Sequence, residues 1–152
     1  MNERIRELPK WDVRFIELAK HVSEWSKDPS TKVGAVIVDL NRRVVSTGYN
    51  GFPRAVDDHI SRYNNREEKL EIIIHGEINA ILFAQRSLQY CTLYTFPFMP
   101  CSRCASIVIQ SGISRVCSVI SDSPRWRKNF ELSEKLFKEA GVEVKLYDIG
   151  IL

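Results

Sequence analysis

Three residues of this 152-residue chain could together bind a metal ion, and a fourth could transfer protons. His75, Cys101 and Cys104 supply one nitrogen and two sulfur donors, the ligand set of a catalytic zinc that leaves its fourth position to water. Glu77 follows the histidine by two residues, and a hard carboxylate is not needed to complete a Cys/Cys/His set. We therefore predict that Glu77 acts as a general acid/base and does not bind the metal.

Two other interpretations of the C-x-x-C pair are a closed structural zinc site and a thioredoxin-like dithiol. A closed site would need a fourth ligand from elsewhere in the chain. The candidates are His21, His59, Cys91 and Cys117. The joint occurrence of one histidine, one glutamate and both cysteines favours a catalytic zinc, one per chain.

Two predicted helices would position these residues. Apolar residues at helical spacing predict a helix from Ile72 to Arg86, with His75 and Glu77 near its N-terminal turn. The positive end of that helix dipole favours Glu77 as a carboxylate. A second helix is predicted over residues 101–110, and it places both thiolates on one face, one turn apart.

The remaining pattern predicts alternating helices and strands. Helices are expected over residues 11–27 and 131–140, a hairpin over 33–39 and 44–49, and strands over 91–96, 115–120 and 142–147. Residues 54–71 are polar and are expected to form a loop with a short helix. This order predicts an α/β fold, a three-layer α/β/α sandwich with a five-stranded mixed sheet.

Composition limits the function classes. With 44% hydrophobic and 27% charged residues, we expect residues 1–152 to form one globular domain. No apolar run approaches about 18 residues and the N-terminal segment lacks a hydrophobic stretch, so we expect neither a membrane span nor a secretory signal. Two of the four cysteines are assigned to the metal, and Cys91 and Cys117 are expected to be buried apolar residues. This use of cysteine without disulfides suits a reducing compartment, so we expect a cytoplasmic location. The net charge of +3 is spread along the chain, so nucleic-acid binding is not expected.

The motif H-x-E followed by P-C-x-x-C resembles the zinc-dependent cytidine/deoxycytidylate deaminase superfamily. Further blocks resemble the deoxycytidylate (dCMP) deaminases most closely and extend the resemblance over roughly residues 11–146. These blocks are Ser26-Lys27-Asp28-Pro29-Ser30, Val33-Gly34-Ala35, Gly48-Tyr49-Asn50-Gly51-Phe52-Pro53 and Glu77-Ile78-Asn79-Ala80-Ile81.

The resemblance implies hydrolytic deamination of dCMP to dUMP with release of ammonia, at the zinc described above. It implies that Glu77 takes a proton from activated water and passes it to N3 of cytosine and to the leaving amine. The backbone N–H of Gly76, where the family usually has alanine, would contact the pyrimidine carbonyl. Asn50 would face the sugar, since an amide can donate to and accept from a hydroxyl.

The resemblance also implies regulation and assembly. Tyr49, Asn50 and Gly51 would hold a nucleotide effector, with Mg²⁺ entering only with a triphosphate, and the chain would form a homo-oligomer, often a hexamer in this family. The segment Pro97–Pro100 is one residue longer than is common and would line the pocket. From the residues alone, the segment 122–129, which holds Arg125, Trp126, Arg127 and Lys128, could be a surface loop or could contact the substrate phosphate.

Three alternative functions remain open from the residues. The chain could deaminate another cytosine nucleotide, deaminate a base in a polynucleotide, or serve as a non-catalytic nucleotide-sensing module on the same fold. A polynucleotide deaminase would need a basic groove, which the dispersed charge argues against. A sensing module would have no use for Glu77, which therefore favours an enzyme.

Overall fold

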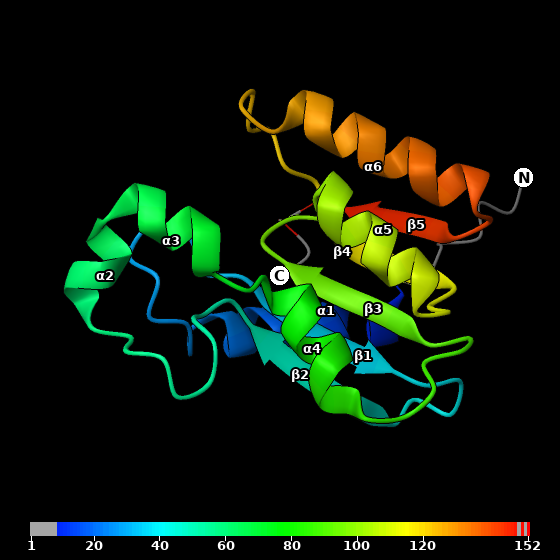
Figure 1. Ribbon diagram of the computed structural model, residues 1–152. Coiled ribbons are helices and arrows are strands. Elements are labelled where there is room, and N and C mark those ends of the chain that lie inside the picture. The colour runs from blue at the N-terminus through cyan, green and yellow to red at the C-terminus, as the bar shows by residue number, and fades with distance from the viewer. Residues whose placement is uncertain (1–8, 149, 151) are drawn as a thin grey trace, which may run out of the picture.

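The computed structural model describes residues 9–148, 150 and 152, and these form one five-stranded sheet with helices on both faces (Figure 1). The strand order is β2-β1-β3-β4-β5. Strand β1 is antiparallel to both β2 and β3, whereas β3, β4 and β5 run parallel, so the sheet is mixed as predicted. The strand bounds are β1 Gly34–Val38, β2 Val44–Tyr49, β3 Thr92–Phe96, β4 Arg115–Val119 and β5 Glu143–Tyr147.

Helix α1 covers one face of the sheet, and α4, α5 and α6 cover the other (Figure 1). Two further helices, α2 and α3, extend beyond the end of the sheet at which β2 and β3 finish. The helix bounds are α1 Lys10–Ser23, α2 Ile60–Asn64, α3 Arg66–Ile72, α4 Gly76–Ala84, α5 Ser102–Gln110 and α6 Arg127–Glu139. The predicted three-layer α/β/α sandwich is confirmed. Within the described part of the chain, no helix has the length and apolar character that a membrane crossing requires.

Strand β1 contributes to both hydrophobic cores, because successive side chains of a strand point to opposite faces. Ala35 and Ile37 pack in the core under α4, α5 and α6, while Val36 and Val38 pack in the core under α1. Every residue of β1 is buried, as expected of a strand covered on both faces.

Gly48 allows β2 to approach the first turns of α4 closely. A Cβ built on Gly48 would lie 2.3 Å from the backbone nitrogen of Ala80 and 2.4 Å from the carbonyl oxygen of Gly76. These are backbone atoms that cannot move independently of the helix. The Ser46 hydroxyl, on the same strand, donates a hydrogen bond to the Ala80 carbonyl at 2.7 Å. The start of α4, and with it the candidate site, is therefore held directly against the sheet.

The prediction of a helix from Ile72 to Arg86 is wrong at both ends, since α4 spans only Gly76–Ala84. Ile73 is extended, and Ile74 pairs with Gly51 through backbone hydrogen bonds of 2.8 and 3.1 Å. This long-range bridge diverts the backbone from a helical path just before His75. At the other end, Gln85 adopts a left-handed conformation.

Three other segments also differ from expectation. The helix predicted over residues 11–27 ends four residues early, at Ser23. The polar stretch 54–71, expected to be a loop with one short helix, contains most of two helices, α2 and α3. Helix α6 begins at Arg127, four residues before the predicted start at Glu131. In the stretch 54–71 and at the start of α6, polar residues without a clear hydrophobic period form helices because tertiary contacts override local preference.

Candidate metal centre and active-site pocket

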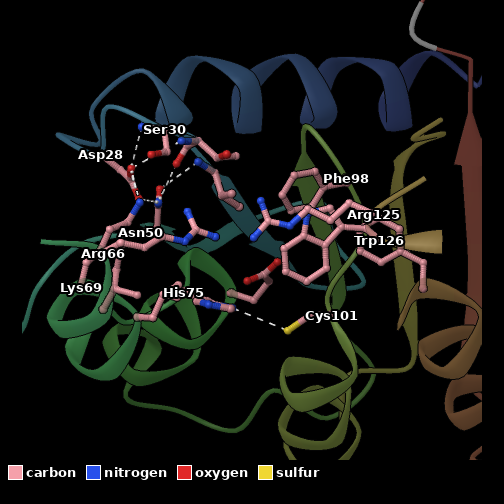
Figure 2. A pocket seen from close by; sticks show the side chains of 16 residues that line it. Asp28, Ser30, Asn50, Arg66, Lys69, His75, Phe98, Cys101, Arg125 and Trp126 are labelled. Carbon is pink, nitrogen blue, oxygen red and sulfur yellow. Dashed lines mark hydrogen bonds and ion pairs between the residues drawn. The ribbon is translucent and has the colours of Figure 1, made fainter. Parts of the chain in front are cut away.

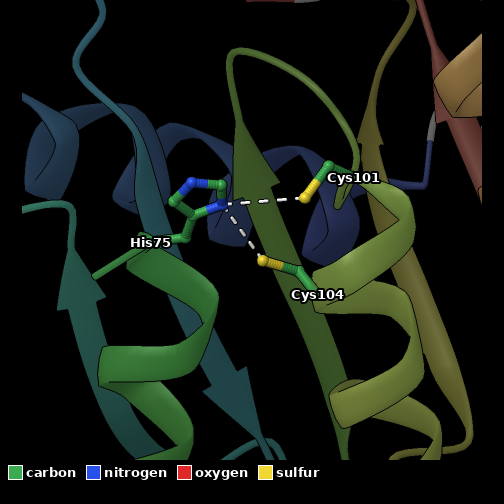
Figure 3. A group of neighbouring side chains, drawn as sticks. All are labelled: His75, Cys101 and Cys104. Carbon is green, nitrogen blue, oxygen red and sulfur yellow. Dashed lines mark hydrogen bonds between the residues drawn. The ribbon is translucent and has the colours of Figure 1, made fainter. Parts of the chain in front are cut away.

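The three residues predicted to bind zinc lie together where two helices begin (Figure 3). His75 precedes the first residue of α4, Cys101 precedes the first residue of α5, and Cys104 lies in the first turn of α5. The Nδ1 atom of His75 lies 3.1 Å from the Cys104 sulfur and 3.6 Å from the Cys101 sulfur. One ligand atom from each residue lies within 4.8 Å of the others.

This donor set fits Zn²⁺ with an open fourth position. Zn–N bonds near 2.0–2.1 Å and Zn–S bonds near 2.3 Å, set at tetrahedral angles, require about 3.5 Å between nitrogen and sulfur. The observed separations bracket that value. Among the described residues the cluster contains no fourth histidine, cysteine or carboxylate, so the closed structural site finds no fourth ligand there.

The electrostatics of the cluster also favour a cation. Hydrogen bonds from Cys104 and from His75 stabilise the Cys101 thiolate. Burial of Cys101 opposes ionisation, but the hydrogen bonds outweigh it and lower the pKa of Cys101 to about 4. The pKa of Cys104 is raised because that residue keeps the shared proton and is buried. Zinc binds thiolates, so metal binding would release this proton.

Glu77 lies in the first turn of α4, and its side chain is almost completely buried. Its Oε2 atom has no hydrogen-bond partner among the described residues. Burial raises the pKa of Glu77 above its ordinary value. A buried carboxyl oxygen without a partner is costly unless a ligand, water or ion completes it, so Glu77 is a candidate for contact with a bound ligand.

His75, Glu77 and Cys101 line a pocket of about 160 Å³ that is partly open to solvent (Figure 2). One side of the pocket is an aromatic wall formed by Phe98, Trp126 and Phe130, whose ring centroids lie 5.6–6.4 Å apart. A polar wall on the other side comes from the loop after α1, from Asn50 and from α3. Its residues are Asp28, Ser30, Thr31, Asn50, Arg66 and Lys69.

Asn50 lies in this pocket, but its amide group is held by the protein. Its Oδ1 accepts a hydrogen bond from the Val33 backbone at 2.8 Å, and its Nδ2 donates to Thr31 O at 2.8 Å and to Asp28 at 3.2 Å. Both amide hydrogens are therefore engaged. Asn50 could accept a further hydrogen bond from a substrate hydroxyl through Oδ1, whereas donating one would require it to release a protein partner.

The residues predicted to hold an effector do not share one environment. The Tyr49 side chain is 41% exposed and lies edge-on to Trp25, with ring centroids 6.3 Å apart. Gly51 is paired with Ile74 in the backbone bridge.

Gly76, predicted to contact the pyrimidine, is the first residue of α4, where the backbone N–H lies outside the helical hydrogen-bonding pattern. A Cβ on Gly76 would lie 3.2 Å from the Val33 carbonyl, so alanine would fit only tightly there.

The pocket contains a helix face that the sequence interpretation missed. Arg66, Lys69, Leu70 and Ile73 all line it from α3 and the residue after it. Their i, i+3, i+4, i+7 spacing places them on one side of a helix, and this signal was present in the sequence. It was missed because only two of the four residues are apolar.

Comparison with known proteins places these features in one family. A family model described as the cytidine and deoxycytidylate deaminase zinc-binding region matches residues 9–120. A protein of Aliivibrio fischeri described as an uncharacterized deaminase in the luxG 3' region is 44% identical over 148 residues, which is 95% of this chain and 99% of the relative. The deoxycytidylate deaminase of Mus musculus is 33% identical over 144 residues, covering 91% of this chain and 80% of that protein.

Solved structures show the same fold. The dCMP deaminase from the cyanophage S-TIM5, solved in complex with dCMP and dUMP, aligns with a TM-score of 0.72 at 22% sequence identity. The alignment covers 91% of this chain and 98% of that one. At this level of identity the likeness establishes the fold alone.

Proposed function

The chain belongs to the cytidine and deoxycytidylate deaminase zinc-binding family, and on that premise we propose that it deaminates dCMP to dUMP and ammonia. The observation that carries the proposal is the buried Glu77 carboxyl, with one unpartnered oxygen, beside a His/Cys/Cys cluster in one pocket. Relatives described as deoxycytidylate deaminases support the choice of substrate.

His75, Cys101 and Cys104 would hold the zinc, because they supply a tetrahedral donor set with one position left over. Zinc, when bound, supplies Lewis-acid activation of water at neutral pH. The starts of two helices position the three donors, because His75 and Cys101 each precede a helix and Cys104 lies in the first turn of α5.

Glu77 would move the protons of the reaction. It accepts a proton from the attacking water, returns it to N3 of the cytosine ring, and assists protonation of the amine that leaves as ammonia. Burial suits this role because it raises the carboxyl pKa above its ordinary value, which makes the carboxylate a stronger base toward water. The side chain is held inside the first turn of α4, which limits the number of orientations it can adopt.

The pocket walls would orient the nucleotide. A pyrimidine ring can stack against the aromatic wall of Phe98, Trp126 and Phe130. The free backbone N–H of Gly76 would donate to the pyrimidine carbonyl, and Asn50 would accept a hydrogen bond from the sugar. Phe98 belongs to the segment Pro97–Pro100, so the extra residue in that segment would affect nucleotide binding through the position of the aromatic wall.

Ammonia release from a substrate panel tests the function. The zinc-loaded protein is assayed with dCMP, CMP, dCTP, deoxycytidine and a cytosine-containing oligonucleotide, and Glu77→Gln serves as the inactive control. We expect dCMP to have the highest kcat/KM. Preference for the oligonucleotide would indicate a polynucleotide deaminase, and turnover of none of the five would indicate a nucleotide-sensing module.

We further propose that the protein is a cytoplasmic homo-oligomer, with a hexamer as the expected state. Exposed apolar side chains on α4, Leu82 and Phe83, support packing between subunits.

Tyr49, Asn50 and Gly51 would hold a triphosphate effector with Mg²⁺. Sigmoidal saturation by dCMP, made hyperbolic by dCTP with Mg²⁺ and opposed by dTTP, would support this regulation. A monomer by light scattering with hyperbolic kinetics would contradict it.

A further inference from the structure

Two arginines reach the pocket from opposite walls. Arg66 is the first residue of α3, and Arg125 lies in the loop before α6. Figure 2 shows both side chains extended toward the interior of the pocket from opposite sides. Within the part of the chain that the structure describes, neither guanidinium forms a hydrogen bond or a salt bridge, although Arg125 lies over the Trp126 ring at 5.6 Å.

The pocket lacks carboxylates that could neutralise these two charges. The Asp28 carboxylate is paired with Lys69 at 2.8 Å, and both side chains are buried. Glu77, the other acidic residue lining the pocket, is buried beside the metal ligands. Lys69 is therefore committed to the protein, and two exposed guanidinium groups remain on the walls. Like charges on one pocket repel each other, and a shared anion relieves the repulsion.

Local structure aims both arginines. Asn65 caps α3 by accepting a hydrogen bond from the Glu68 backbone at 3.3 Å, which sets the start of the helix at Arg66. The buried Lys69, one turn later, attaches α3 to Asp28 in the loop after α1, on the same pocket wall. Arg125 is placed over Trp126, a member of the aromatic wall.

We propose that Arg66 and Arg125 form a two-sided clamp for the 5'-phosphate of the nucleotide. The inference rests on the proposed function and assigns to these residues the selection of a nucleoside monophosphate over the free nucleoside. Guanidinium groups suit the task because they bind phosphate oxygens through paired N–H donors and stay charged at every working pH. With Trp126 beneath Arg125, the clamp lies next to the wall on which the base would stack.

Kinetics of two substrates test the clamp. Arg66→Gln and Arg125→Gln remove the charge and keep a polar side chain of similar width. Each should lower kcat/KM for dCMP by about 10- to 100-fold, as expected for lost hydrogen bonds to a charged group. Each should leave kcat/KM for deoxycytidine within about twofold, and the double variant should lose most of the preference for dCMP. Arg127→Gln is the matched control, since it removes the same charge two residues away without touching the pocket.

Equal losses with both substrates, or no loss with dCMP, would overturn the clamp while leaving dCMP deamination intact. Calorimetric binding of dUMP to the zinc-loaded protein separates the clamp from the function. If the wild type releases no ammonia from dCMP, the proposed function fails. The clamp is still supported if both arginine variants bind dUMP about 10- to 100-fold more weakly while Arg127→Gln binds it normally. Binding of dUMP that is unaffected by either variant, or absent in the wild type, overturns it.

Discussion

Lys69 and Asp28, which are 41 positions apart, form a buried ion pair in which Nζ lies 2.8 Å from Oδ1. Their side chains are only 8% and 4% exposed. The same aspartate accepts hydrogen bonds from the Ser30 backbone at 2.8 Å and from the Asn50 amide at 3.2 Å. One carboxylate thus joins α3, the loop after α1 and the end of β2 into a single pocket wall.

Removing the lysine should be costly. Lys69→Met leaves the Asp28 charge buried without its cation, and we expect a loss of about 3–5 kcal/mol in the free energy of unfolding, measured by urea titration. Lys27→Met is the matched control, because Lys27 pairs with Asp58 at a similar distance of 2.7 Å with both side chains exposed. That control should leave stability nearly unchanged. Similar stabilities for the two variants would show that the buried pair contributes little.

Zinc content should depend on each of the three donors. We expect about one zinc per chain by elemental analysis of the wild type, and well under half of that in Cys101→Ala, Cys104→Ala and His75→Ala. Because metal binding is coupled to folding, these variants should also unfold at lower urea concentration. Cys91→Ala alters a buried cysteine outside the cluster and should keep its zinc. Full occupancy in Cys104→Ala would exclude the assignment.

Substituting the buried glutamate should separate catalysis from metal binding. Glu77→Gln preserves the shape of the side chain but cannot take up or release the catalytic proton. We expect kcat for dCMP to fall about 10²–10⁴-fold or more, with zinc content unchanged. Stability should not decrease, since the Oε2 atom makes no hydrogen bond that the substitution would break. Loss of zinc from this variant would indicate that Glu77 serves the metal directly.

The pH dependence of stability should report on Asp12. Burial of this carboxyl opposes ionisation, but hydrogen bonds from Arg115 and two tyrosines outweigh it, so the pKa of Asp12 lies below its ordinary value of 3.8. Arg115 donates from both terminal nitrogens at 2.7 and 2.8 Å, and Tyr94 and Tyr147 donate at 2.8 and 2.6 Å. A depressed pKa in the folded state stabilises the protein above the ordinary pKa, and the contribution is lost as pH falls through the folded value.

Asp12→Asn should therefore cost about 3 kcal/mol at pH 7, and the difference from wild type should shrink below about pH 4. Urea titrations from pH 7 down to pH 3 measure it. Asp122→Asn changes an exposed carboxylate without a partner among the described residues and should show no such trend. A difference that grows on acidification would contradict the assigned direction of the shift.

The sequence alone identified the candidate metal ligands and the candidate proton-transfer residue. His75 and Glu77 are two residues apart, and Cys101 and Cys104 are one helical turn apart, so short-range spacing sufficed to group each pair. The β-branched runs likewise predicted all five strands, because alternation and strand propensity are local properties. The mixed sheet and the three layers followed from the order of these elements and from the family resemblance.

Only the tertiary structure decided the rest of the pocket. The start of α4 at Gly76 depends on the bridge between Gly51 and Ile74, which no local pattern contains. The engagement of the Asn50 amide depends on where Asp28 lies, and Asp28 is fixed by Lys69. The sequence did not single out Arg66, and it did not distinguish Arg125 from the other cations of segment 122–129; the fold brings these two arginines to one cavity. The physical reason is that burial, ion pairing and loss of partners depend on residues distant in the chain, whereas periodicity reports only on near neighbours.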